Sequence, residues 1–207
     1  MNNTLQHRFI HPDDRPLFLL SMISLGIHLW ANLFDGIFID ELYYVACSKH
    51  LDFGYVDHPP FVALIGALTR LLFGESLFAL RIPAVLTNAS IVFLTGRLAR
   101  QLGGNRNAQI LASLAALICP TYLGIGSYFS MNVFDHLFWL LAFYILVRII
   151  QTNRPGDWIG LGIILGLGLQ NKISVLFFGF GLGIGILLTP HRRWLFSKWV
   201  WISGAIA

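Results

Sequence analysis

Long apolar runs dominate this chain and leave few ways for it to fold in water. Only 12% of its 207 residues are charged, whereas a soluble domain has about 25%. A run of about 20 apolar residues crosses a bilayer as a helix. We therefore predict an all-α, polytopic membrane protein with about six transmembrane helices. The predicted spans are residues 17–34, 82–98, 108–127, 133–150, 158–169 and 173–188. Residues 199–207 resemble the start of another span, so we expect residues 1–207 to be one membrane domain, the N-terminal part of a longer enzyme.

The connection between the first two spans, residues 35–80, is predicted to be an outer loop with juxtamembrane helices. Within it, residues 59–74 carry an apolar stripe at helical spacing, and Pro60 suits the first turn of a helix. The uninterrupted apolar part is too short to cross a bilayer. We therefore expect a helix that lies in the membrane interface.

The distribution of basic residues supports this topology. With the amino terminus inside and residues 59–74 on the outer surface, most Lys and Arg residues fall on the cytoplasmic side. They are Arg8, Arg15, Arg97, Arg100, Arg106, Arg148, Arg154, Arg192, Arg193 and Lys198. A crossing at residues 59–74 would reverse this split and violate the positive-inside rule. Because orientation explains the net charge of +4, we expect no nucleic-acid partner.

Two adjacent acids, Asp40 and Glu41, open a short helix predicted over residues 40–51. Asp40 is placed to cap this helix, where the helix dipole favours a carboxylate. Glu41, Tyr44 and Ser48 recur at i, i+3 and i+7, which gives the helix one polar face. An ordinary capped surface helix has the same spacing. The position at a membrane–water boundary nevertheless makes Asp40 and Glu41 catalytic candidates and Tyr44 a substrate-binding candidate.

A second motif, Asp57-His58-Pro59-Pro60, follows in the same loop. The two prolines restrict His58 to extended geometry and start the next helix, so Asp57 and His58 are held in fixed positions. We take both as substrate-binding candidates. A rigid turn without a task in catalysis would have the same sequence.

Three further candidates lie at the ends of later spans. Asp135 is a catalytic candidate because an acid inside a membrane segment is expensive and by default functional. Asn132 lies three residues earlier on the same helix face and is a substrate-binding candidate, although a residue there could also simply cap the helix. Lys172 lies between two short, Gly-rich spans, where a polar linker can sit below the membrane surface. There it meets a phosphate as a point charge, or it snorkels to the headgroups.

The order of these motifs resembles that of the polyprenyl-phosphate-dependent GT-C membrane glycosyltransferases of the glycosyltransferase family 39 type. This group includes protein mannosyltransferases and aminoarabinose lipid A transferases. The resemblance covers roughly residues 38–193. Its strongest parts are Asp40-Glu41-Leu42-Tyr43-Tyr44, Asp57-His58-Pro59-Pro60-Phe61 and Leu80-Arg81-Ile82-Pro83, with weaker agreement at Ser130-Met131-Asn132 and Gln170-Asn171-Lys172.

The resemblance implies transfer of a sugar from a polyprenyl phosphate to a lipid, glycan or protein acceptor. The reaction would take place at the periplasmic or exterior face of the inner (plasma) membrane, among membrane lipids. The resemblance places the catalytic acid at Asp40 and the donor phosphate at Arg81 and Lys172. Counted back from Trp139, the family's second acid falls on Asn132, with Asp135 one turn later. A divalent metal held with that acid is therefore left open, and no other cofactor is expected.

Two other classes of function also fit the sequence. A membrane transporter is favoured by the broken spans around Lys172, although most acids lie outside the predicted spans. An inverted internal repeat would favour a transporter, and the sequence has none that we detect. A catalytically silent membrane subunit is favoured by Asn132 in place of an acid.

Overall fold

The structure, a computed structural model, describes residues 14–207 and confirms the predicted all-α fold. Arg8, one of the basic residues assigned to the cytoplasmic side, lies outside the described residues. Within 14–207 there is no β-strand. The elements are α1 (Arg15–Ala31), α2 (Ile39–Lys49), α3 (Phe61–Phe73), α4 (Leu77–Gln101), α5 (Arg106–Ile118), α6 (Pro120–Gly126), α7 (Met131–Thr152), α8 (Pro155–Asn171), α9 (Val175–Leu188), the 3₁₀ helix η2 (Pro190–Phe196) and α10 (Lys198–Ile206).

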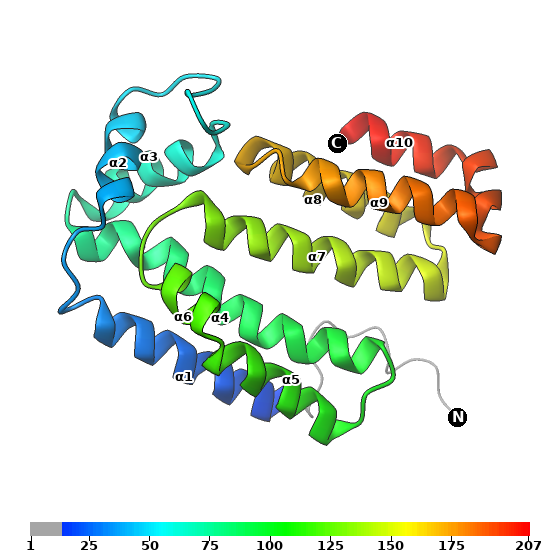
Figure 1. The fold of residues 1–207 in the computed structure, drawn as a ribbon, viewed down its shortest axis with the longest axis horizontal. Helices are drawn as coiled ribbons and strands as arrows, with labels where there is room; N and C mark the ends of the chain where they lie inside the picture. Colours follow the sequence, from blue (N-terminus) through cyan, green and yellow to red (C-terminus); the bar gives the residue numbers. More distant parts are fainter. Residues whose placement is uncertain (1–13) are drawn as a thin grey trace.

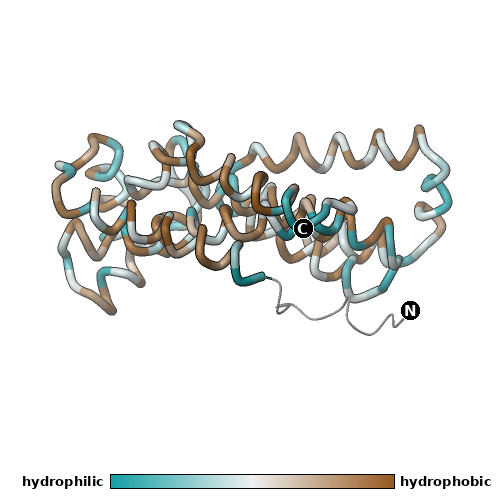
Figure 2. The backbone as a smooth tube through the Cα atoms, turned by 90° about the horizontal axis from the view of Figure 1, so that it is seen from below, coloured by the Kyte–Doolittle hydropathy of each residue, from teal (hydrophilic) through white to brown (hydrophobic). Residues whose placement is uncertain are grey.

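The long helices form a bundle whose axes run in broadly the same direction (Figure 1). Helix α4 packs against α1, α5 and α7, and α8 packs against α7 and α10. The short helices α2 and α3 lie together at one end of the bundle, beside the start of α4 (Figure 1). We call this the α2–α3 end. Apolar positions dominate the helices, and hydrophilic positions gather mostly in the connections (Figure 2).

Among residues 14–207, two helices, α4 and α7, are each long and apolar enough to cross a membrane. The number rises to four if the bent pairs α5–α6 and α9–η2 each form one span. Helices α1 and α3 are apolar but shorter. The chain is therefore a multi-pass membrane protein, while the count of about six spans stays a prediction. Helix α3 has 13 residues, as expected for a helix too short to span, and its interfacial position also stays a prediction.

The predicted span over residues 108–127 is two helices in the structure, bent by 58°. Cys119 between them is extended, with φ −64° and ψ 121°. Proline disfavours the helical conformation of the residue before it and lacks an N–H for the ladder. Pro120 therefore ends α5 at Ile118 and starts α6.

Two sets of buried contacts hold the bundle at its ends. At the α2–α3 end, a core cluster joins α2, α3, α4 and α7 through Tyr44, Val62, Leu80, Phe129 and Phe134, among others. At the opposite end, the Asp14 carboxylate lies 2.7 Å from the Arg97 guanidinium and 2.8 Å from that of Arg100. These ion pairs fasten the start of α1 to the end of α4.

A buried polar cluster between α1 and α4 leaves room for only a glycine at position 126. His28 Nδ1 lies 2.8 Å from the Ser24 carbonyl oxygen, and His28 Nε2 lies 3.3 Å from Asn88 Nδ2. A Cβ atom at Gly126 would meet His28 Nε2 at 2.6 Å and Asn88 Cγ at 2.8 Å. Contacts this short force the buried side chains to shift.

Gly126→Ala is therefore expected to destabilise the protein by about 1–3 kcal/mol. Gly124→Ala is the matched control, because a Cβ at Gly124, on the same helix, meets nothing within 4 Å. Thermal unfolding of the purified protein in detergent measures both changes. Equal unfolding midpoints for the two variants would contradict the close packing at Gly126.

Candidate functional site

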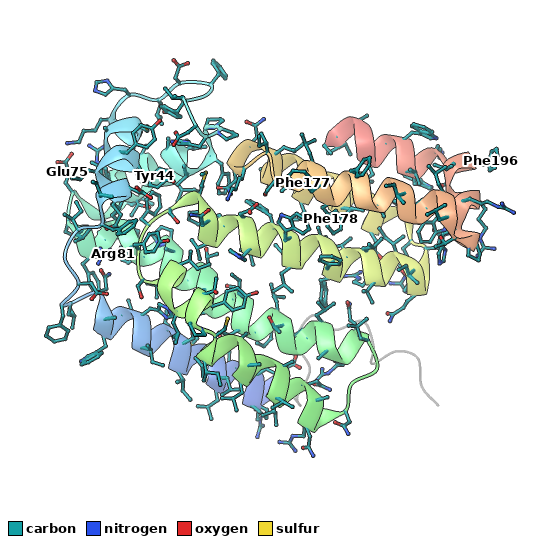
Figure 3. The ribbon with its side chains drawn as sticks, in the orientation of Figure 1. Tyr44, Glu75, Arg81, Phe177, Phe178 and Phe196 are labelled. Carbon is teal, nitrogen blue, oxygen red and sulfur yellow. The ribbon has the colours of Figure 1, made fainter. Side chains whose placement is uncertain are left out.

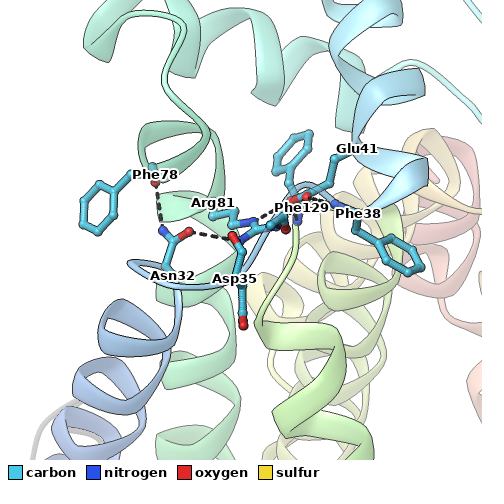
Figure 4. Close-up of polar contacts among 8 residues, drawn as sticks. Asn32, Asp35, Phe38, Glu41, Phe78, Arg81 and Phe129 are labelled. Atoms are coloured by element: carbon cyan, nitrogen blue, oxygen red, sulfur yellow. Dashed lines mark hydrogen bonds and ion pairs between the residues drawn. The ribbon is translucent and has the colours of Figure 1, made fainter.

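A buried ion pair between Arg81 and Glu41 organises the α2–α3 end (Figure 4). Arg81 lies near the start of α4 and is 1% exposed, and Glu41 lies in the first turn of α2 and is 0% exposed. The Arg81 guanidinium binds the Glu41 carboxylate through two hydrogen bonds: Nε donates to Oε1 at 2.8 Å and Nη2 donates to Oε2 at 2.6 Å. A two-point contact of this kind fixes direction as well as distance.

The remaining polar atoms of the pair bind the backbone of other segments. Arg81 donates to the carbonyl oxygens of Gly36 at 2.7 Å and Asp35 at 3.2 Å, and to the Asn32 side chain at 3.3 Å. Glu41 accepts from the backbone N–H groups of Phe38 and Phe129, each at 2.8 Å. The pair thus ties together the segment after α1, helices α2 and α4, and the loop before α7.

This network leaves no N–H of Arg81 without a protein partner, because a guanidinium has five donors and all five are used. A phosphate that bound Arg81 would have to displace one of these bonds. Glu41 is likewise surrounded by donors. The geometry therefore suits both residues to positioning their neighbours.

Asp40 differs from Glu41 in its surroundings. It lies in the first turn of α2 and is exposed. The sequence placed the helix cap at Asp40; in the structure α2 begins at Ile39, and it is Glu41 that accepts from the N–H of the N-cap residue, Phe38. This is half of a capping box. Relieved of capping, the Asp40 carboxylate is available to a ligand that approaches from outside the bundle.

The negative charge of Asp40 contributes to a raised pKa at two tyrosine hydroxyls, those of Tyr44 and Tyr128. Burial raises the pKa of Tyr44 to about 12, with the negative charge of Asp40 adding to the rise. Burial also raises the pKa of Tyr128, again with a contribution from Asp40. Both hydroxyls therefore stay protonated at neutral pH and can donate hydrogen bonds beside Asp40. Tyr44 is buried against Phe129, with ring centroids 6.2 Å apart, and Figure 3 shows it next to α3.

His58 is buried among three tyrosines, although the sequence indicated only a fixed position. Its ring lies 4.8 Å from Tyr55, 5.2 Å from Tyr44 and 5.4 Å from Tyr43, measured between centroids. Its Nδ1 lies 2.8 Å from the Pro59 carbonyl oxygen, and the buried Nε2 has no hydrogen-bond partner among the described residues. Asp57 is exposed and lies beside Tyr43, where a hydrogen bond between the two side chains raises the pKa of Tyr43.

Lys172 and Asn132, 40 residues apart, meet where α8 ends and α7 begins. The Lys172 ammonium donates to Asn132 Oδ1 at 2.9 Å. Next to it, the Asn171 side chain donates to the Met131 carbonyl oxygen, also at 2.9 Å. No ion pair joins Lys172 to a carboxylate within residues 14–207. Within that range the ammonium is therefore bound by a neutral amide rather than by a carboxylate.

Asp135 lies one turn further along α7 and is 9% exposed. Its Oδ1 accepts a hydrogen bond from the Ser174 hydroxyl at 2.6 Å, and the Trp139 indole N–H reaches the same hydroxyl at 3.4 Å. Ser174 was not among the predicted residues. Its place two residues after Lys172, ahead of an apolar helix, is the signal that could have found it.

The start of α7 connects the two groups of candidates. The Tyr44 hydroxyl, beside Asp40, contacts the backbone of Met131, which lowers the Tyr44 pKa against the larger effect of burial. Met131 and the adjacent Asn132 hold Asn171 and Lys172. The fold therefore brings Asp40, Tyr44, Asn132 and Lys172 to one region, while Glu41 and Arg81 form the buried network beside it.

No group of three His, Cys, Asp or Glu side chains in residues 14–207 has the arrangement that a metal ion needs. The nearest acids to the site differ in their partners: Glu41 is bound by Arg81, and Asp135 by Ser174.

Three comparisons place the chain among known proteins. Residues 57–207 match the family described as dolichyl-phosphate-mannose-protein mannosyltransferase. The chain is 27% identical over 186 residues to lipid A galacturonosyltransferase RgtD of Rhizobium johnstonii. This match covers 83% of this chain and 37% of that protein. It is 26% identical over 127 residues to the undecaprenyl phosphate-alpha-4-amino-4-deoxy-L-arabinose arabinosyl transferase of Enterobacter sp.. That match covers 59% of this chain and 23% of the relative.

The fold is similar to that of the S. cerevisiae protein O-mannosyltransferase Pmt1-Pmt2 complex bound to the sugar donor. The TM-score is 0.78 at 17% identity, and the match covers 98% of this chain and 32% of that one. At this identity the likeness shows the fold alone, which confirms the predicted GT-C type architecture. The chain spans about a third of this structure and of RgtD, and less of the arabinosyl transferase.

Proposed function

Because the chain belongs to the dolichyl-phosphate-mannose-protein mannosyltransferase family, we propose that it carries the site at which a membrane glycosyltransferase moves a sugar from a polyprenyl phosphate to an acceptor. The name of the arabinosyl transferase relative specifies an undecaprenyl phosphate donor, and that of RgtD specifies lipid A. The proposed donor here is a sugar on a polyprenyl phosphate. The proposed acceptor is a lipid, with a glycan or protein as the alternatives.

The observation that carries this proposal is the series of neighbouring residues from Asp40 to Lys172. The Asp40 carboxylate lies one helical turn before Tyr44 on α2 and acts on it electrostatically, and the Tyr44 hydroxyl contacts the backbone of Met131. The adjacent Asn132 binds Lys172, a lysine without an ion-pair partner among the described residues. Sugar transfer from a lipid phosphate needs these two groups: a base for the acceptor hydroxyl and a cation for the leaving phosphate.

The proposed reaction is a single displacement at the anomeric carbon of the donor sugar. The acceptor oxygen forms a bond to this carbon while the bond from the carbon to the phosphate oxygen breaks. Asp40 takes the proton of the acceptor hydroxyl. The polyprenyl phosphate leaves with the bonding electrons, and Lys172 stabilises its growing negative charge. Tyr44 and Tyr128 donate hydrogen bonds to the substrates beside Asp40.

The other candidates have supporting roles in this proposal. Glu41 and Arg81 hold α2 and the loop before α7 in place, so that Asp40 and Tyr44 face the substrates. Asp135 orients Ser174 and thereby the turn that carries Lys172. His58 and Asp57 fix the tyrosine cluster of the outer loop.

The proposed location is the inner (plasma) membrane, with the α2–α3 end on the periplasmic or exterior side. The basic residues favour this orientation, because Arg97, Arg100, Arg106 and Arg154 lie at the opposite ends of their helices from Asp40 and Lys172. A hydrophilic acceptor then reaches Asp40 from the aqueous side, and the lipid donor reaches Lys172 from the bilayer.

Lys172→Ala is expected to weaken binding of undecaprenyl phosphate to the full-length protein by about 10- to 100-fold, since a hydrogen bond to a charged group contributes about 1.5–3 kcal/mol. Asn132→Asp is expected to weaken it as well, because the new carboxylate would neutralise the ammonium that Asn132 now contacts. Equilibrium binding in nanodiscs measures both effects.

Lys49→Ala serves as the control for this pair of variants. Lys49 is an exposed lysine on α2, and its ammonium lies 3.7 Å from the Glu75 carboxylate. Its removal changes the net charge by the same amount and is expected to leave phosphate affinity unchanged. Equal losses in Lys49→Ala and Lys172→Ala would mean that Lys172 acts only through overall charge, and normal binding by Lys172→Ala would remove it from the donor site.

A further inference from the structure

A pair of aromatic rings from two separate segments lies beside Asp40. Phe38 is the residue before α2, and Tyr128 belongs to the loop before α7. Their ring centroids are 4.6 Å apart, and the ring planes are inclined by 32°. Phe38 is 43% exposed and Tyr128 is half-buried. In Figure 4 the Phe38 ring points away from Arg81. We call these two rings the aromatic platform.

The buried ion pair fixes the backbone on both sides of the aromatic platform. The Glu41 carboxylate accepts from the N–H of Phe38 through Oε2 and from the N–H of Phe129 through Oε1, each at 2.8 Å. Phe129 directly follows Tyr128 and is 0% exposed. Arg81 holds the same carboxylate with two hydrogen bonds. The two rings are therefore in place before a ligand arrives, and binding does not have to order them.

Polar groups border the aromatic platform. Asp40 lies two residues after Phe38 and is exposed. Burial raises the pKa of Tyr128, and the charges of Asp40 and Glu41 add to the rise, so the Tyr128 hydroxyl lies near Asp40. A sugar ring is complementary to this arrangement. The C–H groups on one face of the sugar carry a small positive charge and meet the negative face of an aromatic ring. The hydroxyls around the sugar need hydrogen-bonding groups, which a carboxylate and a phenol supply. An acyl chain would cover the rings but leave these polar groups without partners.

We propose that Phe38 and Tyr128 form a stacking subsite for a sugar ring of the acceptor, with Asp40 binding a hydroxyl of that ring. This inference rests on the proposed function and narrows the acceptor to a molecule that carries a sugar. The subsite belongs to the acceptor because of its position relative to the donor's phosphate. Lys172, the proposed phosphate ligand, is connected to Asp40 through Tyr44 and the start of α7. Phe38 precedes Asp40 in the chain, on the side of Asp40 opposite to Tyr44. A sugar on the aromatic platform therefore lies on the acceptor side of the base.

Two substitutions at Phe38 separate stacking from simple apolar contact. Phe38→Leu keeps an apolar side chain and the backbone bond to Glu41 but removes the ring, whereas Phe38→Trp keeps a ring. Phe34→Leu is the matched control: Phe34 is an aromatic residue of the same connection, is 72% exposed, and has its ring 5.4 Å from that of Trp30. Thermal unfolding checks that each variant is folded. If Phe38→Leu unfolds, Tyr128→Leu removes the other ring of the aromatic platform and repeats the test.

The experiment measures binding of small probes to the full-length protein in nanodiscs by saturation-transfer NMR. The probes are methyl β-D-glucopyranoside and methyl β-D-galactopyranoside, with sorbitol as a polyol that has hydroxyls but no ring. The unchanged protein and Phe38→Trp are expected to bind at least one glycoside more tightly than sorbitol. Phe38→Leu is expected to weaken glycoside binding by about 2- to 10-fold, the size of one aromatic stacking contact. Phe34→Leu is expected to leave glycoside binding unchanged.

The inference is overturned if the unchanged protein binds neither glycoside better than sorbitol, or if Phe38→Leu binds both normally. Equal losses in Phe38→Leu and Phe34→Leu would overturn it too, because the Phe38 ring would then act only as a membrane contact. A second pair of probes, undecaprenyl phosphate glucose and undecaprenyl phosphate, identifies the source of the sugar. If Phe38→Leu weakened only the first of these and left the methyl glycosides unaffected, the subsite would belong to the donor's sugar and the acceptor assignment would be wrong.

Binding of undecaprenyl phosphate by Lys172→Ala tests the proposed function separately. Weaker binding by that variant, together with normal glycoside binding by Phe38→Leu, would reject the stacking subsite and leave the proposed function standing. Normal undecaprenyl phosphate binding by Lys172→Ala, together with weaker glycoside binding by Phe38→Leu, would keep the sugar subsite and remove the lysine from the donor site.

Discussion

Asp40→Asn is expected to lower the rate of sugar transfer by about 10²–10⁴-fold, the usual contribution of a general base. The substitution keeps the size and polarity of the side chain and removes the proton acceptor. Asp40 is exposed in the first turn of α2, and the N-cap N–H is already bound by Glu41. Loss of a carboxylate there is therefore expected to have little effect on folding. The measurement is transfer from a polyprenyl-phosphate sugar by the full-length protein at matched expression.

Two further variants separate catalysis from charge and from the second acid. Asp52→Asn removes an exposed carboxylate of the same outer loop and is expected to retain normal transfer. Asp135→Asn keeps a hydrogen-bond acceptor for Ser174 and is expected to reduce transfer less than Asp40→Asn does. Near-normal transfer by Asp40→Asn would refute the assignment of the base. Loss confined to Asp135→Asn would move the base to α7.

Glu41→Gln is expected to destabilise the protein by about 3–5 kcal/mol, because it leaves the buried Arg81 guanidinium without its counter-charge. Arg81→Lys is expected to be destabilising too, since an ammonium lacks the planar fork that binds both carboxylate oxygens and three further acceptors. Thermal unfolding and the yield of monodisperse protein in detergent measure this effect.

Glu75→Gln is the matched control. Glu75, which is labelled in Figure 3, also pairs with an arginine, Arg70, but its side chain is 64% exposed. Solvent screening weakens a surface pair of this kind. Its loss is expected to change the unfolding midpoint little. An inactive Glu41→Gln protein with a normal midpoint would contradict the positioning role and return Glu41 to the chemistry.

Features that depend on near neighbours in the chain were predicted well. The apolar runs and their breaks placed the helices, and the α3 stripe predicted a helix too short to span. The spacing of Glu41, Tyr44 and Ser48 predicted that they share a face, which the structure confirms, since all three are buried on one side of α2. The break at Pro120 was missed because the apolar run continues across it, although the proline itself was the local signal.

The burial and the partners of the candidate residues, by contrast, were not predicted from the sequence. Asp40 and Glu41 are adjacent and chemically alike, and the sequence assigned both to catalysis and the cap to Asp40. Only the packing of α2 against α4 and the loop before α7 separates them, since it buries Glu41 on Arg81 and leaves Asp40 exposed. Arg81 binds residues that lie 40 to 49 positions away in the chain, and the spacing of neighbouring residues gives no sign of such contacts.

The sequence by itself determined the class of fold, the helical segments and the set of polar residues from which a site can be built. The physical reason is that lipid requires every backbone group to be satisfied within its own helix, so apolar length and helix breakers are local properties. Tertiary structure alone decided which of these residues meet: Lys172 with Asn132, Asp135 with Ser174, and Arg81 with Glu41. Each pair depends on how separate helices pack, and packing is decided by the surfaces of both partners together.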